Sequence, residues 1–161
     1  MLPRIHPMRL RLVREPFDHP DYIFELKHDG FRAVAYLQNC ECKLISRNQR
    51  NLGFETLKRS LVRLPVQNAI IDGEIICLDA KGVSQFNQLL SRKGEPVLYA
   101  FDLLWLDGED LRRRPLIERK KRLARLVRSA KCPRLLYAQH IEQRGKSLFA
   151  AAFTRATGTP G

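Results

Sequence analysis

The sequence lacks the features that define several large protein classes. It has four cysteines in 161 residues, no Cys-x-x-Cys pair, and four histidines that form no ligand pattern with them, so free thiols are expected rather than a zinc site. No apolar run approaches the length of a membrane span, and no secretory signal follows the N-terminus, which predicts a cytoplasmic protein with no membrane partner. A glycine-rich phosphate loop of the Walker or Rossmann type is also missing. A nucleotide would therefore have to be bound by side chains on strands.

Acidic residues are nearly absent from the last third of the chain. Residues 1–111 contain 15 Lys/Arg and 15 Asp/Glu, whereas residues 112–161 contain 14 and 2, so the second range carries the whole net charge of +12. This concentration favours a polyanionic partner, with nucleic acid as the first candidate. The alternative is a basic helix exposed to solvent without a partner. The residues expected to bind DNA are Arg112, Arg113, Arg114, Arg119 and Lys120.

The hydrophobic pattern predicts more strands than helices. Four prolines within residues 1–21 predict an extended N-terminal segment. The segments expected to form strands are 22–27, 31–38, 42–47, 69–78, 97–106 and 135–141. The segments expected to form helices are 54–63, 84–92, about four turns after Pro115, and 147–156. Because neighbouring strands can pair antiparallel, we expect an α+β fold with antiparallel sheets flanked by helices.

One lysine stands at a chemically suggestive position. Lys27 lies between Glu25 and an Asp-Gly pair, where a predicted strand meets a tight turn, with Arg32 five residues on. A lysine that loses its proton in a pocket becomes a nucleophile. The competing interpretation is an ordinary surface hairpin, since Asp-Gly is a favoured two-residue turn.

Three further features could surround such a lysine. Asp72 and Glu74 lie two apart in an apolar strand and therefore face one side, where a cation, hydroxyl or metal must compensate them; pairing of one with a core arginine is the alternative. Phe101 is a core residue by default, although its ring could stack on a purine. Arg47 follows a predicted strand and could bring a guanidinium to a phosphate.

In this order and spacing, these segments resemble a known family. The Lys27 segment, Ser46-Arg47-Asn48, residues 69–74 and residues 99–104 look like motifs I, Ia, III and IIIa of the covalent nucleotidyltransferases, and within them of the bacterial ATP-dependent DNA ligases. The resemblance implies an ATP-grasp-like adenylation domain over residues 22–152. It also implies that Lys27 attacks the α-phosphate of ATP and forms lysyl-AMP. AMP then passes to the 5′-phosphate of nicked double-stranded DNA, and the 3′-hydroxyl displaces it.

The resemblance assigns further contacts to the nucleotide. Glu25 and Leu26 would border the adenine, and Phe101 would stack on it. Glu74 would bind the ribose hydroxyls or help to hold Mg²⁺ or Mn²⁺. The implied phosphate contacts, to AMP or to the nick, are Arg32 and Arg47.

The sequence departs from the family pattern after residue 152. The Glu-Gly and lysines of motifs IV and V, and an oligonucleotide-binding domain, are not found, and residues 153–161 are expected to be a disordered tail outside the family. Gln49 replaces a glycine that the family often has. These departures predict a C-terminally truncated adenylation domain with weak or no ligation activity. A non-catalytic nucleic-acid-binding remnant and an RNA ligase with the same chemistry remain the alternatives.

Overall fold

The structure, a computed structural model, describes residues 2–8 and 11–157. The chain divides into two compact units: the first comprises Met1–Pro7 and His28–Tyr137, and the second comprises Met8–Lys27 and Ala138–Gly161. In the described ranges, no helix is long and apolar enough to cross a membrane.

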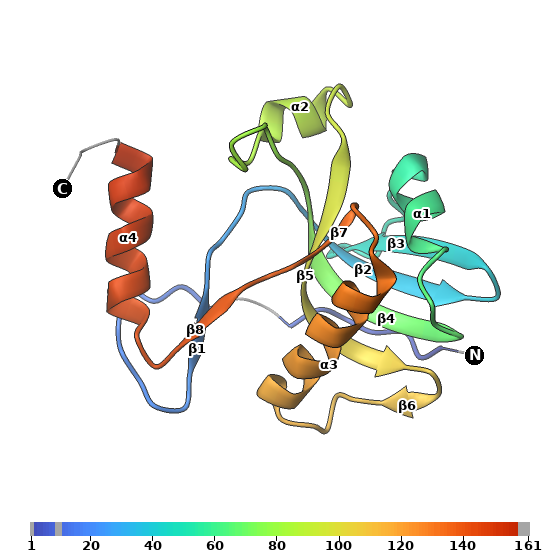
Figure 1. The fold of residues 1–161 in the computed structure, drawn as a ribbon, viewed down its shortest axis with the longest axis horizontal. Coiled ribbons are helices and arrows are strands. Elements are labelled where there is room, and N and C mark those ends of the chain that lie inside the picture. The colour runs from blue at the N-terminus through green and yellow to red at the C-terminus, as the bar shows by residue number, and fades with distance from the viewer. Residues whose placement is uncertain (1, 9–10, 158–161) are drawn as a thin grey trace. The chain divides into compact units, whose positions relative to one another are not determined.

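The first unit is built on one sheet with the strand order β3-β2-β4-β5-β6, to which β7 adds by pairing with β5 (Figure 1). All pairs are antiparallel except β5 with β7, which is parallel. The strands are β2 (Phe31–Gln38), β3 (Glu41–Ser46), β4 (Asn68–Cys77), β5 (Pro96–Leu106), β6 (Glu109–Asp110) and β7 (Leu135–Tyr137). The predicted α+β fold with antiparallel sheets flanked by helices is confirmed.

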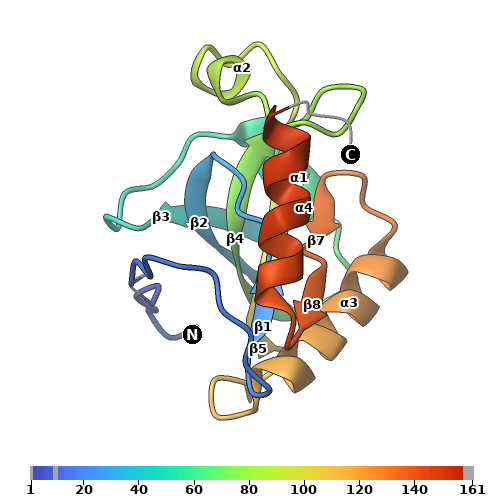
Figure 2. The ribbon, with the colours of Figure 1, turned by 90° about the vertical axis from the view of Figure 1, so that its left-hand side faces the viewer.

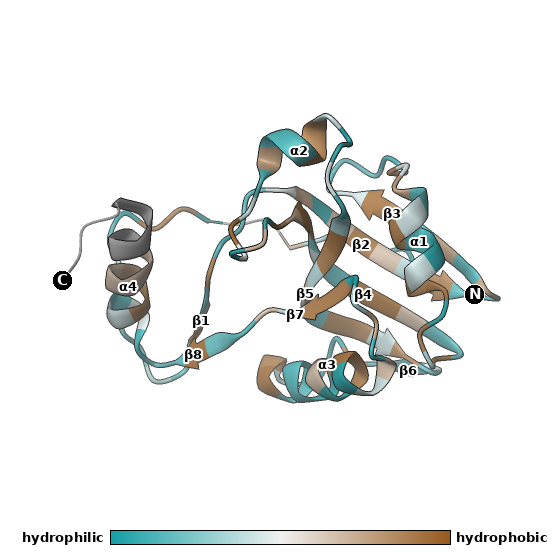
Figure 3. Ribbon diagram, turned by 45° about the horizontal axis from the view of Figure 1, so that its top comes forward, coloured by the Kyte–Doolittle hydropathy of each residue, from teal (hydrophilic) through white to brown (hydrophobic). Residues whose placement is uncertain are grey.

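Helices cover one face of this sheet, called here the helix face. Alternate residues of β2 and β4, such as Ala35 and Ile71, point to it and are fully buried. Leu57 of α1 (Glu55–Leu61) and Leu123 of α3 (Leu116–Ala130) pack into the same cluster, and the short α2 (Phe86–Leu90) adds Leu89. Figure 3 shows α1 and α3 against the apolar strands. This cluster is the main core of the unit.

The opposite face of the sheet, called here the open face, has a much smaller core. Val34, Ile70 and Leu104 form it, and Ile5 of the N-terminal segment packs on them. The Tyr36 hydroxyl accepts a hydrogen bond from the Ile5 backbone N–H at 2.8 Å, which fastens that segment to β2. Most polar side chains of the central strands point to this face, because they alternate with the residues buried under the helices.

The second unit pairs β1 (Ile23–Glu25) with β8 (His140–Glu142) and continues into α4 (Gly145–Thr157), the red helix that follows β8 in Figure 2. Asp18 caps the helix start by accepting a hydrogen bond from the Lys146 N–H at 2.9 Å. Gly145 is needed there because a Cβ would lie 2.2 Å from the Phe17 carbonyl oxygen and 2.4 Å from the Phe24 ring.

The hairpin considered as the alternative for Lys27 does not form. The strand predicted over 22–27 is limited to β1 and pairs with β8, whereas β2 pairs with β3 and β4. Gly30 is not in a positive-φ turn. It is required because a Cβ there would lie 2.2 Å from the Ile75 carbonyl oxygen. Asp-Gly therefore marks a close approach of the chain to β4, and the interpretation of Lys27 as an ordinary hairpin residue is wrong.

Two other boundaries differ from expectation. The strand predicted over 135–141 is divided into β7 and β8, which belong to different sheets and different units. The tail expected from residue 153 continues α4 as far as Thr157, and residues 158–161 lie outside the described residues. The described residues before Ile23 form no helix or strand, in keeping with their prolines.

Gly73 offers a direct test of how closely β4 and β5 pack. A Cβ at this position would lie 2.8 Å from both Leu98 Cδ1 and the Tyr99 carbonyl oxygen, so Gly73→Ala must push β5 away. We expect the free energy of unfolding to fall by about 1–3 kcal/mol. Gly53→Ala is the matched control, because a Cβ there meets nothing within 4 Å, and its effect should stay within about 0.5 kcal/mol. Urea denaturation of both variants measures this, and equal stabilities would contradict the packing described.

Candidate active site

A pocket of about 260 Å³ opens at the end of the sheet where β2 begins and β3 ends. Arg32 and Glu74 are register partners on β2 and β4, so both side chains project from the open face. The residues that line the pocket are Gly30, Phe31, Arg32, Ser46, Arg47, Asn48 and Glu74. Three of the residues predicted to contact nucleotide, Arg32, Arg47 and Glu74, are thus brought together.

The loop after β3 presents Arg47 through a tight turn. The Gln49 N–H donates to the Ser46 carbonyl at 2.9 Å, and the Arg50 N–H donates to the Ser46 hydroxyl at 3.1 Å. Gln49 has a φ of 60°, the left-handed conformation that glycine adopts most easily. Gln49 therefore completes a left-handed turn, at some cost in backbone strain.

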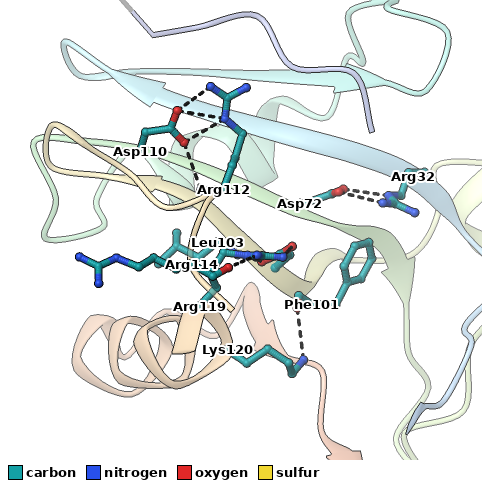
Figure 4. Close-up of polar contacts among 10 residues, drawn as sticks. Arg32, Asp72, Phe101, Leu103, Asp110, Arg112, Arg114, Arg119 and Lys120 are labelled. Atoms are coloured by element: carbon teal, nitrogen blue, oxygen red, sulfur yellow. Dashed lines mark hydrogen bonds and ion pairs between the residues drawn. The ribbon is translucent and has the colours of Figure 1, made fainter. Parts of the chain in front are cut away.

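Arg32 is held rigidly at the pocket wall. Its Nε and Nη2 donate to the two carboxylate oxygens of Asp72, each at 2.8 Å (Figure 4). Its guanidinium carbon also lies 4.5 Å from the centre of the Phe101 ring. Burial opposes the charge of Arg32, but Asp72 and then Glu74 and Asp102 outweigh it, so the pKa of Arg32 lies above its ordinary value. The site thus contains one fixed cation backed by an aromatic ring.

The two carboxylates of β4 have different environments. Asp72 is 5% exposed, and burial raises its pKa against the hydrogen bonds from Arg32, which lower it. This is the arginine pairing left open above. Glu74 instead lines the pocket. No group of three or more potential acidic, histidine or cysteine metal ligands occurs among the described residues. A single carboxylate still suits Mg²⁺, which is commonly held by one or two carboxylates together with substrate phosphates.

Phe101 and Asp102 are fixed by α3, the helix expected to bind DNA. Arg119 donates from Nε and Nη2 to Asp102 at 2.8 Å each. Lys120 is fully buried, and its Nζ donates to the Phe101 carbonyl at 3.2 Å. Lys120 has no exposed surface to offer to a DNA phosphate, and a phosphate at Arg119 would have to displace Asp102. The DNA-binding roles of these two residues remain predictions.

The remaining predicted DNA contacts are exposed, but two of them are already paired. Arg112 forms an ion pair with Asp110, and Arg114 with Glu109. Arg113 makes no hydrogen bond or ion pair within the described part of the chain. The two ion pairs reduce what Arg112 and Arg114 can offer to a phosphate, whereas Arg113 acts on Asp110 only through charge, without an ion pair.

Lys27, Glu25 and Leu26 belong to the second unit and are exposed. Glu25 ends β1, and Lys27 follows two residues later, outside any strand. The chain just after Lys27 is anchored in the first unit: the His28 ring lies 4.5 Å from that of Tyr99, and the Asp29 carbonyl accepts a hydrogen bond from Ser84. The roles of Lys27, Glu25 and Leu26 remain predictions.

Sequence reasoning missed the support given to Phe101. The signal was present, because Asp102 is a lone acidic residue within an apolar strand and a buried carboxylate needs a cation. Its partner could not be identified from composition, since α3 contains several arginines and lysines that look alike in sequence.

Comparison with known proteins identifies the class to which this fold belongs. A structure of the ligase domain of LigD from M. tuberculosis has a TM-score of 0.75 at 27% identity, covering 87% of this chain and 46% of that one. A structure of mycobacterial DNA ligase D complexed with ATP and MES has a TM-score of 0.70 at 26% identity, covering 83% and 44%. The fold is therefore that of part of the ligase domain of ATP-dependent DNA ligases.

Sequence comparison gives the family. The model of the ATP-dependent DNA ligase domain matches residues 9–156, and the chain belongs to this family, as the motifs predicted. The multifunctional non-homologous end joining protein LigD of Pseudomonas aeruginosa is 31% identical over 155 residues, which are 92% of this chain and 18% of that protein. The prophage-derived DNA ligase-like protein LigB of Bacillus subtilis is 29% identical over 122 residues, 72% and 45% respectively. The chain thus spans less than half the length of these relatives.

The pairing of Arg112 can be tested by titration. Hydrogen bonds from Arg112 lower the pKa of Asp110 to about 2. The ion pair therefore contributes its stability above the ordinary aspartate pKa of about 3.9 and loses it as the pH falls through about 2. In Arg112→Ala, we expect the pKa of Asp110 to return toward about 3.9, measured by NMR titration of its carboxyl carbon. An unchanged pKa would show that the pair does not form in solution.

Proposed function

We propose that this chain is an adenylation domain of an ATP-dependent DNA ligase and that Lys27 carries AMP. The observation that supports this most directly is the pocket that combines Arg32, Arg47 and Glu74, in a member of the DNA ligase family. A cytoplasmic location and nicked double-stranded DNA as substrate are parts of the same proposal.

The first step is proposed as an attack of the uncharged Lys27 amine on the α-phosphate of ATP. A bond forms between the lysine nitrogen and phosphorus, the bond to the β-phosphate oxygen breaks, and pyrophosphate leaves while the amine gives up a proton. AMP then passes to the 5′-phosphate of a nick, and the 3′-hydroxyl displaces it to seal the strand. The negative charge on the phosphoryl oxygens and on the leaving group in each step must be met by nearby cations.

The pocket residues supply that environment in the proposal. Arg32, fixed by Asp72, and Arg47, on the loop after β3, stabilise phosphate charge. Phe101 offers a ring on which adenine stacks, and Glu25 and Leu26 border the base. Glu74 binds the ribose hydroxyls or a metal; Mg²⁺ or Mn²⁺, when bound, would neutralise the triphosphate.

AMP attachment is the test of this function. We expect intact-mass spectrometry to show a gain of one AMP after incubation with ATP and Mg²⁺ or Mn²⁺, and no gain in Lys27→Ala. Lys81→Ala is the matched control, because Lys81 is an exposed lysine outside the pocket and should leave the gain unchanged. A wild-type protein that is folded by circular dichroism and gains no mass, or a gain that survives in Lys27→Ala, would refute the proposal.

A second candidate function is nucleic-acid binding without catalysis, and the outer surface of α3 favours it. Lys121, Arg125 and Arg128 lie four and three residues apart, so they share one side of the helix. They are exposed and make no hydrogen bond or ion pair with any described residue. We call these three residues the outer stripe. Because α3 packs on the helix face, the outer stripe lies across the sheet from the pocket.

Salt dependence separates this candidate from the first. If the outer stripe binds phosphates, replacing its three residues by alanine should weaken binding to an intact DNA duplex and reduce the slope of log affinity against log salt by up to about 2.7. A triple variant of Lys81, Arg92 and Lys93 removes the same charge elsewhere and is the control. Equal slopes for both variants, measured by fluorescence anisotropy, would exclude the outer stripe as a DNA contact.

A further inference from the structure

The strand that carries Phe101 departs from regular pairing at this residue. Asp102 is paired with Asp72 and Ala100 with Gly73, so Phe101 is an extra residue that has no partner on β4. A bulge of this kind changes the direction of nearby side chains, and bulges often occur beside active sites. The sheet itself therefore does not fix the Phe101 ring, and its position depends on other contacts.

Helix α3 supplies contacts at the bulge and at the residue that follows it. The Phe101 carbonyl accepts a hydrogen bond from buried Lys120 (Figure 4). The Asp102 carboxylate accepts two from Arg119, and its Oδ1 also accepts from the Leu103 N–H at 2.8 Å. The chain directly after the Phe101 side chain is thereby tied, through the Phe101 carbonyl and the Asp102 carboxylate, to two consecutive residues of one helix.

Each of the three guanidinium nitrogens of Arg119 already donates a hydrogen bond. Its third nitrogen, Nη1, donates to the Arg114 carbonyl at 2.6 Å, and its side chain is only 15% exposed. A bidentate guanidinium–carboxylate pair fixes orientation as well as distance, which a lysine at position 119 could not do. These are properties of an anchor, and they differ from those of an exposed phosphate contact.

The opposite end of the arrangement is Arg32. Its guanidinium lies over the Phe101 ring, and Asp72 holds it there. An aromatic ring has two faces, and Arg32 takes one of them, leaving the other for a planar base. The position of Phe101 is therefore set by the backbone anchor on α3 and by the cation over the ring.

We propose that Arg119, acting through Asp102 and aided by Lys120, is a positioning residue that holds the Phe101 ring against Arg32 in the geometry needed to stack a nucleotide base. This rests on the proposed adenylation function for the identity of the base. Arg119 and Lys120, which the sequence alone associates with DNA binding, are thereby given a role in the nucleotide site.

The first arm of the test needs no nucleotide. Protons of the Arg32 guanidinium that lie over the Phe101 ring should show an upfield ring-current shift in NMR spectra, and Phe101→Leu defines the value without a ring. We expect Arg119→Ala to move the shift toward that of Phe101→Leu. Arg122→Ala should leave it unchanged, because Arg122 is on the same helix but pairs with Glu109. An unaltered shift in folded Arg119→Ala would overturn the proposal.

A second variant covers the case in which Arg119→Ala does not fold. Arg119→Lys keeps the charge but cannot make the bidentate pair, so its ring-current shift should fall between the wild-type and Phe101→Leu values. A shift in Arg119→Lys identical to that of the wild type would overturn the proposal in the same way.

The second arm measures nucleotide affinity with α,β-methylene ATP, which cannot transfer AMP. Since base stacking on an aromatic side chain is worth about 1–3 kcal/mol, we expect Arg119→Ala to weaken binding by about tenfold. In the Phe101→Leu background, the same change should have almost no further effect, because both act through one ring. Additive losses would show a general structural role and overturn the proposal.

The two arms also separate this proposal from the function on which it rests. If the wild type does not bind the nucleotide while Arg119→Ala abolishes the ring-current shift, the adenylation function fails and the positioning of Phe101 is supported. If the nucleotide binds and the shift does not change, the adenylation function stands and the positioning role fails.

Discussion

The carboxylate of Asp72, buried in the middle of the central strand, is the constraint on which the rest of the site depends. An ionised carboxylate cannot be taken out of water without a partner, and Arg32 from the neighbouring strand supplies it with two parallel hydrogen bonds. Arg32 is in turn immobilised, because its departure would leave the buried Asp72 carboxylate without a cation. A cation that in solution would sample many rotamers is thus fixed at the wall of a pocket before any ligand arrives.

The same principle divides the basic residues of the chain into two populations. Some make contacts within the fold: Arg119 pairs with Asp102, and the buried Lys120 donates a hydrogen bond to the Phe101 backbone carbonyl. Others, such as Lys121 and Arg125, remain at the surface with their charge uncompensated by any described residue. The number of cations that α3 offers to a polyanion is therefore smaller than the net charge of +12 suggests. Two residues next to each other in the sequence can differ in this respect, one buried in the fold and the other exposed.

Much of the fold could be predicted from the sequence, because alternation of apolar residues is a local property. The long strands β2, β4 and β5 and the helix α3 lie within one or two residues of their expected limits. Strand pairing is not a local property, and for pairing the sequence pattern led to wrong expectations. Asp29-Gly30 has the composition of a hairpin turn, yet Gly30 is needed for contact with a strand more than forty positions away. Residues 135–141 read as one strand because nothing in their composition marks the change of sheet at Ala138.

For the site, motif order identified Arg32, Arg47 and Glu74, which line one pocket. Composition alone could not distinguish Lys120 from the exposed Lys121, because the difference is one of helical phase against a particular strand. Glu25, Leu26 and Lys27 lie in the other unit, so their assignment still rests on the motifs.

The burial of Lys120 makes this residue a natural reporter of motion. An ammonium with no exposed surface cannot meet an amine-modifying reagent unless α3 lifts from β5. Its rate of chemical labelling, compared with that of Lys121 beside it, would therefore measure the free energy of that local opening without any unfolding of the whole domain. In the helix that supports the ring of Phe101, Lys120 would thus report detachment from β5, and Lys121, one residue on, would serve as the internal reference.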